Sequence, residues 1–117
     1  RDWDIYFMKP DGTHQFNLTD NFGIDFTLPS WSPDGRYLAF DGRFTTPLRL
    51  GGRGNNDIYA MPMGGLYSFS RLTNNETSKA DLYQGPAVWS PNGKNIAIIS
   101  RRTGQSRVLV LEVIENP

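Results

Sequence analysis

The chain has 117 residues, and its 12 lysines and arginines balance 12 aspartates and glutamates, so no overall field favours nucleic acid or an anionic membrane as a partner. The absence of cysteine excludes disulfides and thiolate metal sites, although it leaves the cellular compartment open. The longest apolar runs, 96–99 and 108–111, are far shorter than the ~20 residues of a membrane-spanning helix, so we expect a chain that is not membrane-spanning.

The first part of the chain indicates short strands joined by turns. Residues rich in β-branched and aromatic side chains, bounded by turn signals, predict strands at 4–8, 15–18, 29–32 and 37–41. Ser32-Pro-Asp-Gly35 fits a tight type I turn, because serine, proline and glycine occupy their preferred positions. Residues 9–12 predict a second turn, and the composition of 20–25 predicts a loop.

The second part continues the same way, with longer loops. Residues 42–56 and 74–85 are polar and predict loops, and Gly64-Gly65 predicts a turn between two strands. The strands predicted here are 57–61, 68–72, 88–90, 95–100 and 107–113. No segment has a sustained period of 3.6 residues, so helix should be nearly absent.

Two phrases of this sequence recur. The stretch 29–40, with Trp31-Ser-Pro-Asp-Gly35, returns as 86–98 with Trp89-Ser-Pro-Asn-Gly93, at a spacing of 58 positions. Asp4-Ile-Tyr-Phe-Met8 returns as Asp57-Ile-Tyr-Ala-Met61, and a Leu-Thr pair follows each copy, at Leu18-Thr19 and Leu72-Thr73. Internal repetition of this length indicates a propeller or a solenoid.

The strands are apolar on both faces. Tyr37–Phe40, Ile58–Met61 and Val108–Leu111 show no alternation of apolar and polar residues, although tight turns make their neighbours antiparallel. Both faces of such a sheet must therefore be covered, as they are when sheets stack side by side as propeller blades.

This order of motifs resembles the repeat of the TolB-like (WD40-like) β-propeller family, in which each blade has four antiparallel strands. The resemblance implies an all-β fold, with 4–19 as the end of one blade, 29–73 as a full blade and 87–113 as most of a third. The sequence departs from the family pattern in three places. Residues 44–53 are an insertion, and Asn92 stands where the other copy has Asp34. Ser106-Arg-Val-Leu109 stands where the pattern would have Asp-Ile-Tyr.

These strands amount to about two and a quarter blades, whereas closed propellers have about four to eight. We therefore expect an incomplete ring. The chain opens with Arg1 and its ends fall inside blades, so we expect a fragment of a larger propeller. The alternative is a short chain that assembles with other copies of itself.

The loops suggest where a protein partner or an anionic ligand binds. The long loops 20–28, 42–56, 74–85 and 101–106 should lie on one face, opposite the tight turns, and function concentrates in such loops. Arginine and aromatic residues are enriched at binding hot spots. The candidate partner-binding residues are Arg43, Phe44, Arg49, Arg53, Tyr83, Arg101 and Arg102, with Phe22 nearby. The alternative is that these arginines are solvated or paired with Asp20, Asp25, Glu76 and Asp81.

Other residues favour structural roles. Trp31 and Trp89 occupy equivalent repeat positions and are predicted to pack in the core rather than stack on a ligand. His14 is the only histidine, which leaves no histidine-based metal site or Ser-His pair. Gly51-Gly-Arg-Gly54 lacks the Lys-Ser/Thr pair of a phosphate loop. Asp4, Asp34 and Asp57 should bond to turns and strand ends. We therefore predict no catalytic residue, no metal ligand and no cofactor.

The functional prediction follows from this combination. We predict a noncatalytic propeller module for binding or scaffolding through protein partners or further propeller blades, as the family resemblance implies, located in the bacterial periplasm or outside the cell. The alternative is the propeller portion of an enzyme, such as a prolyl-oligopeptidase-type peptidase or a polysaccharide lyase, since those enzymes carry similar repeats.

Overall fold

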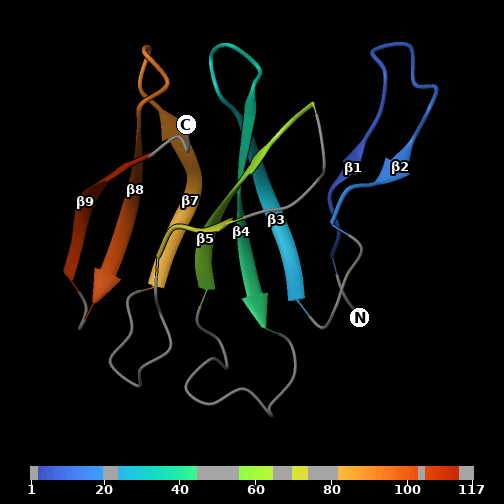
Figure 1. Ribbon diagram of the computed structural model, residues 1–117. Coiled ribbons are helices and arrows are strands. Elements are labelled where there is room, and N and C mark those ends of the chain that lie inside the picture. The colour runs from blue at the N-terminus through green and yellow to red at the C-terminus, as the bar shows by residue number, and fades with distance from the viewer. Residues whose placement is uncertain are drawn as a thin grey trace.

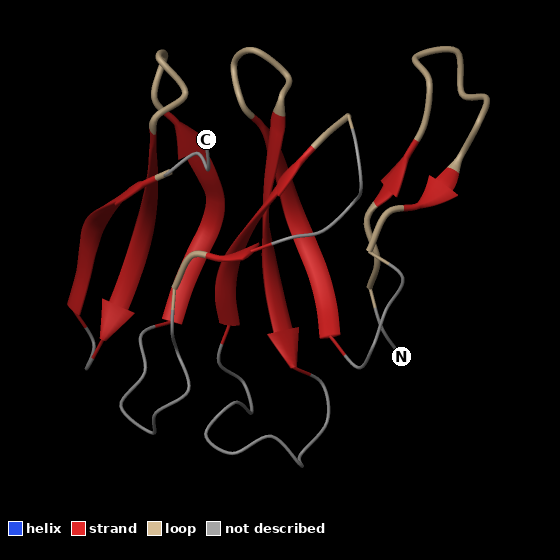
Figure 2. Cartoon of the chain, viewed as in Figure 1, coloured by secondary structure: helices blue, strands red, loops and turns tan. Residues whose placement is uncertain are grey.

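The computed structural model describes residues 3–19, 24–44, 56–64, 70–73, 82–102 and 105–113. Every regular element in these ranges is a strand, as predicted (Figure 2). These segments contain no helix that could cross a lipid bilayer. The fold of the described chain is therefore all β.

The described chain forms three antiparallel sheets that lie side by side (Figure 1). The first sheet pairs β1 (Tyr6–Phe7) with β2 (Phe16–Asn17). The middle sheet has the order β3 (Ile24–Trp31), β4 (Tyr37–Phe44), β5 (Asn56–Pro62) and β6 (Ser70–Arg71). The third sheet has the order β7 (Leu82–Trp89), β8 (Asn95–Arg102) and β9 (Gln105–Glu112). This arrangement confirms the prediction of an incomplete ring of four-stranded blades.

Several predicted loop boundaries are wrong. The loop predicted at 20–25 ends earlier, because β3 begins at Ile24, and the loop predicted at 74–85 gives way to β7 at Leu82. The loops predicted at 42–56 and 101–106 are likewise shortened by β4, β5, β8 and β9. The physical reason is that backbone pairing, such as Asp25 with Arg43 and Leu82 with Arg101, continues through residues whose polar side chains suggested a loop.

A bulge interrupts the first strand of both larger sheets. The register shifts between Thr27 and Ser30 in β3 and between Gln84 and Val88 in β7. Leu28 has a φ of 57° and Gly85 a φ of 75°, so each bulge contains a left-handed residue. Bulges increase local twist and bend a strand, which suits a wedge-shaped sheet.

The first core cluster lies between the first and middle sheets. Ile5 and Leu18 are buried there against alternate residues of β4 and β5, namely Leu38, Phe40, Tyr59 and Met61. Phe26, Phe40 and Tyr59 form an aromatic group with ring centroids 5.5–6.0 Å apart. This cluster covers one face of the middle sheet.

The second core cluster covers the other face. Ala39 and Ile58 from the middle sheet are buried against Ala87, Ile96 and Ile98 from the third sheet. Leu109 and Leu111 of β9 pack at its edge. The prediction that both faces of these strands are covered is therefore confirmed for the middle sheet.

The two tryptophans differ in burial. Trp89 is half-buried beside the second cluster, stacks on Tyr37 at 6.3 Å, and donates from Nε1 to the Ser30 carbonyl at 3.0 Å. Trp31 is 51% exposed, so the prediction that it packs in the core is wrong. The reason is that Trp89 meets strand β3 of the neighbouring sheet. Trp31 instead meets the first sheet, which is described by β1 and β2 alone, and its ring centroid lies 6.0 Å from that of Phe7.

Candidate functional site

The tight turns between β3 and β4 and between β7 and β8 lie at one end of the sheets, together with the β1–β2 turn (Figure 1). We call this end the turn face. The opposite end, where β4 and β8 finish and β5 and β9 begin, is called the loop face. The predicted separation of tight turns from the ends that carry the long loops is confirmed for the described strands.

The β3–β4 turn is built by its own side chains. The Asp34 carboxylate accepts from the Ser32 hydroxyl at 2.9 Å and from the Arg36 backbone N–H at 3.0 Å. The Ser32 hydroxyl in turn accepts from the Tyr37 N–H at 3.0 Å. Gly35 has a φ of 75°, a conformation that glycine adopts without steric cost. The turn is thereby held as a rigid platform.

The β7–β8 turn repeats this network. The Asn92 side-chain oxygen accepts from the Ser90 hydroxyl at 2.7 Å and from the Lys94 N–H at 3.0 Å. The Ser90 hydroxyl accepts from the Asn95 N–H at 3.0 Å. Asn92 can replace an aspartate here because the turn needs an acceptor oxygen rather than a charge.

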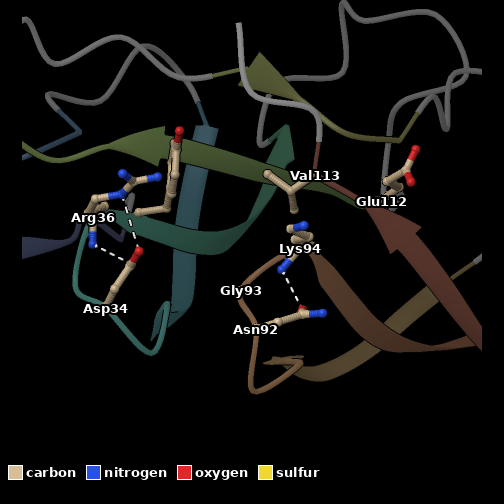
Figure 3. Close-up of a pocket in the computed structure, with 8 residues that line it drawn as sticks. Asp34, Arg36, Asn92, Gly93, Lys94, Glu112 and Val113 are labelled. Carbon is tan, nitrogen blue, oxygen red and sulfur yellow. Dashed lines mark hydrogen bonds and ion pairs between the residues drawn. The ribbon is translucent and has the colours of Figure 1, made fainter. Parts of the chain in front are cut away.

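A cavity of about 520 Å³ lies between these two turns (Figure 3). Its lining includes Asp34, Arg36, Tyr37, Asn92, Lys94 and Glu112. Arg36 Nε lies 3.2 Å from an Asp34 carboxylate oxygen, and its guanidinium lies 5.8 Å from the centre of the Tyr37 ring. The hydrogen bonds from the Arg36 N–H and the Ser32 hydroxyl lower the pKa of Asp34, so this carboxylate is charged at neutral pH.

The cavity brings two cationic and two anionic side chains together around one aromatic ring. Such a lining suits a segment of polypeptide, which offers charges of both signs and backbone groups. No histidine, cysteine or base-and-nucleophile pair is among its lining residues. The described lining can therefore bind a ligand.

Sequence reasoning did not identify this cavity. The signal was present in the repeat, because Asp34-Gly-Arg36 and Asn92-Gly-Lys94 recur at the same position of adjacent units. Equivalent positions of neighbouring blades lie side by side, so a basic residue at the end of each turn produces a pair of cations. Taken one at a time, the two turn sequences indicate only a structural role.

On the loop face, the structure places two of the predicted partner-binding residues. Arg43 near the end of β4 and Arg101 near the end of β8 are both exposed. They occupy equivalent repeat positions on adjacent sheets. Neither forms an ion pair within the described part of the chain, although Asp25 stands opposite Arg43 in the β3–β4 register.

The other predicted residues of this face are placed less fully. Three of them lie at strand ends on the loop face: Phe44 in β4, Tyr83 in β7 and Arg102 in β8. The structure describes the backbone of these three residues but not their side chains. Arg49, Arg53 and Phe22 lie outside the described residues, as do the alternative partners Asp20, Glu76 and Asp81 and the glycines of 51–54. Partner binding by these residues stays a prediction.

The aspartates at repeat positions have the structural roles predicted for them. Asp4 accepts from the Thr19 hydroxyl at 2.8 Å, and Asp57 accepts from the Thr73 hydroxyl at 2.6 Å. Each threonine oxygen accepts from the backbone N–H of the residue after the aspartate, Ile5 and Ile58. These networks hold β1 against the Leu18-Thr19 segment and β5 against the Leu72-Thr73 segment.

His14 is exposed, and its Nδ1 lies 3.0 Å from the Thr13 hydroxyl. The described residues contain no cluster of three or more histidine, cysteine or carboxylate side chains placed to hold a metal ion.

Comparison with known proteins shows which proteins the chain is similar to. No family model matches the chain. A TolB homologue from Chlorobium luteolum is 49% identical over 47 residues, which are 39% of this chain and 11% of that protein. A solved structure assigned to TolB from Agrobacterium tumefaciens aligns with 97% of this chain at a TM-score of 0.62 and 24% identity. The chain spans 38% of the length of that structure, so it corresponds to part of such a propeller.

Proposed function

Because the chain has the repeat and the fold of TolB-like β-propellers, we propose that it is a noncatalytic protein-interaction module of the bacterial cell envelope. It acts as a segment or subunit of a larger propeller, located in the periplasm or outside the cell. Its rigid sheets hold strand ends and turns in fixed positions, and a partner binds across several of them. The short coverage of its relatives makes the activity of the whole protein part of this proposal.

One observation carries the proposal: Arg43 and Arg101 stand exposed at equivalent ends of adjacent second strands. Because these two residues lie at equivalent ends of adjacent sheets, a partner would meet two cations on this face rather than one. Each exposed guanidinium can bind a carboxylate of a partner through charge-assisted hydrogen bonds. The favoured partner is a protein with an acidic surface.

The test is a charge reversal with a matched control on the other face. The immobilised chain, the double variant Arg43→Glu with Arg101→Glu, and the control Arg36→Glu with Lys94→Glu are incubated with a periplasmic extract of Agrobacterium tumefaciens. Retained proteins are identified by mass spectrometry, and one is purified for titration. We expect the loop-face variant to bind that protein at least about tenfold more weakly, because reversed charges repel an acidic surface. The control should bind it unchanged.

Circular dichroism and thermal unfolding establish that both variants are folded. Equal binding by the wild type and the loop-face variant would overturn the assignment of this face. Loss of binding in the control variant alone would move the contact to the cavity of the turn face.

A further inference from the structure

The turn between β7 and β8 carries the only Asn-Gly pair of the sequence, Asn92-Gly93. Asn92 is exposed in this turn and lines the cavity between the two turns. An asparagine followed by glycine is especially open to deamidation, because glycine has no side chain to hinder its backbone nitrogen from attacking the amide carbon. The pair is therefore a candidate site of spontaneous chemical modification.

The hydrogen bonds of this turn polarise the Asn92 side chain. Its Oδ1 accepts from the Ser90 hydroxyl at 2.7 Å and from the Lys94 N–H at 3.0 Å. Negative charge gathers on this oxygen when the amide carbon is attacked, and two fixed donors stabilise such a charge. The side-chain nitrogen, which leaves in the reaction, points away from the Lys94 N–H (Figure 3). The bond from the Gly93 N–H to the Ser90 carbonyl, at 2.9 Å, must open before the attack.

The equivalent turn of the middle sheet shows that the fold accepts an aspartate at this position. Asp34 is the counterpart of Asn92, and its carboxylate accepts from the Ser32 hydroxyl at 2.9 Å and from the Arg36 N–H at 3.0 Å. The glycine that follows has a φ of 75° in this turn and of 72° in the other. An aspartate at position 92 would therefore keep both hydrogen bonds of its turn.

We infer that Asn92 is a modification site, where spontaneous deamidation replaces the amide by a carboxylate. The Gly93 nitrogen bonds to the amide carbon of Asn92, the bond from that carbon to the side-chain nitrogen breaks, and ammonia leaves with the Gly93 proton. Water then opens the cyclic imide, so the reaction consumes only water. Opening at one imide carbonyl gives aspartate, which the turn accepts, and opening at the other gives isoaspartate.

The reaction changes the charge of the cavity. It adds one negative charge to a chain of zero formal net charge, next to the exposed Lys94. The turn then has the same pattern as the equivalent turn, where the Asp34 carboxylate lies 3.2 Å from Arg36 Nε. This inference concerns the turn face and does not depend on the partner proposed for the loop face.

Peptide mapping by mass spectrometry tests the site. The folded chain is kept in a mildly alkaline buffer and sampled at intervals, and each deamidation adds about 1 Da to a peptide. Asn95 is the internal control, and trypsin separates it from Asn92 by cleaving after Lys94. We expect Asn92 to convert at least about tenfold faster than Asn95, because the branched side chain of Ile96 crowds the nitrogen that would attack there. Equal rates, or an unchanged Asn92, would overturn the inference.

Two variants test whether the turn accepts the product. Asn92→Asp should elute with the new acidic species in ion-exchange chromatography and unfold at the same temperature as the wild type, because the acceptor oxygen is kept. Asn92→Ala removes both the amide and the acceptor, so it should form no acidic species at the wild-type rate and should unfold at a lower temperature. An acidic species that forms equally fast in Asn92→Ala would place the reaction at another residue. That result, or a lower unfolding temperature for Asn92→Asp than for Asn92→Ala, would contradict the inference.

Discussion

The middle and third sheets carry the same repeat, yet they bury it differently. In the middle sheet, Leu38 and Phe40 are covered by the first sheet, while Ala39 and Ile58 are covered by the third. In the third sheet, Ile96 and Ile98 are buried, whereas Val108 is 68% exposed. The repeat therefore encodes strands that are apolar on both faces, and the number of adjacent sheets decides how many of their side chains are buried.

The largest expected effect separates the covered face from the open one. Ile58→Ala should lower the free energy of unfolding by about 2–5 kcal/mol, because it removes buried methyl groups and leaves a cavity. Val108→Ala, at the counterpart position, should change it by less than about 0.5 kcal/mol in dilute solution, because its side chain is exposed. Urea unfolding at low protein concentration measures both. Equal losses would mean that the two faces are equally covered.

The second comparison concerns Gly42 in β4, whose counterpart in β8 is Ser100. A Cβ atom on Gly42 would lie 2.6 Å from a ring carbon of the buried Tyr59 and 3.3 Å from one of Phe26. Gly42→Ala should therefore destabilise the protein by about 1–3 kcal/mol through overpacking. The double variant Gly42→Ala with Tyr59→Leu should lose less than the sum of the two single variants, since β9 has Leu109 at the position of Tyr59. Strictly additive losses in urea unfolding would contradict the steric explanation.

Ser100 should respond in the opposite direction. Its side chain is completely buried, and its hydroxyl has no hydrogen-bond partner among the described residues. Ser100→Ala removes this unpaired hydroxyl, so the free energy of unfolding should increase by about 1 kcal/mol. Thermal unfolding measures the gain, and Ser106→Ala, at an exposed position of β9, provides the neutral control. A loss of stability in Ser100→Ala would reveal a bond outside the described residues.

Much of the fold could be predicted because the turn and strand motifs occur twice in the sequence. The turn at Ser32–Gly35 and its copy at Ser90–Gly93 depend on interactions over a few residues, which the sequence displays directly. The burial of Ile58 depends on a neighbouring sheet, but the absence of alternation along β5 already required one. The prediction of blades therefore rested on the turn interactions and on the lack of apolar-polar alternation along the strands.

The remaining errors concern interactions between distant segments. Trp31 and Trp89 each begin a Trp-Ser-Pro turn at the same repeat position, but Trp89 has β3 of the neighbouring sheet beside it. The starts of β3 and β7 depend on pairing partners that are distant along the chain, namely Phe44 for Ile24 and Arg101 for Leu82. The cavity between the two turns arises because adjacent sheets bring Arg36 and Lys94 together, which neither turn encodes alone.

The smallest expected effect concerns Asp41, a polar residue on the covered face where the third sheet has the exposed Ile99. Asp41 is 8% exposed, and its carboxylate accepts from the Asn56 side-chain amide at 2.7 Å. Burial raises the pKa of Asp41 above the ordinary 3.8, because the charged form loses its hydration, although the Asn56 hydrogen bond opposes the shift. The folded protein therefore binds this proton more tightly than the unfolded chain does.

The sign of the pH dependence follows from that difference. The stabilising contribution of Asp41 is complete below pH 3.8 and is lost as the pH rises through the raised pKa of the folded state. Asp41→Asn keeps an oxygen for the Asn56 amide without the charge, so it should be more stable than the wild type at pH 7, by a margin that shrinks toward pH 4. Asp34→Asn is the matched control, because hydrogen bonding lowers the pKa of that exposed carboxyl and Asn92 already serves in the equivalent turn. The stabilising contribution of the Asp34 carboxylate should instead be lost as the pH drops below 3.8. Urea unfolding between pH 3 and 8 distinguishes the pH dependence of Asp41 from that of Asp34. If the margin of Asp41→Asn over the wild type grew toward low pH, the carboxylate would be stabilised by its surroundings, and the covered face would be more polar than its burial indicates.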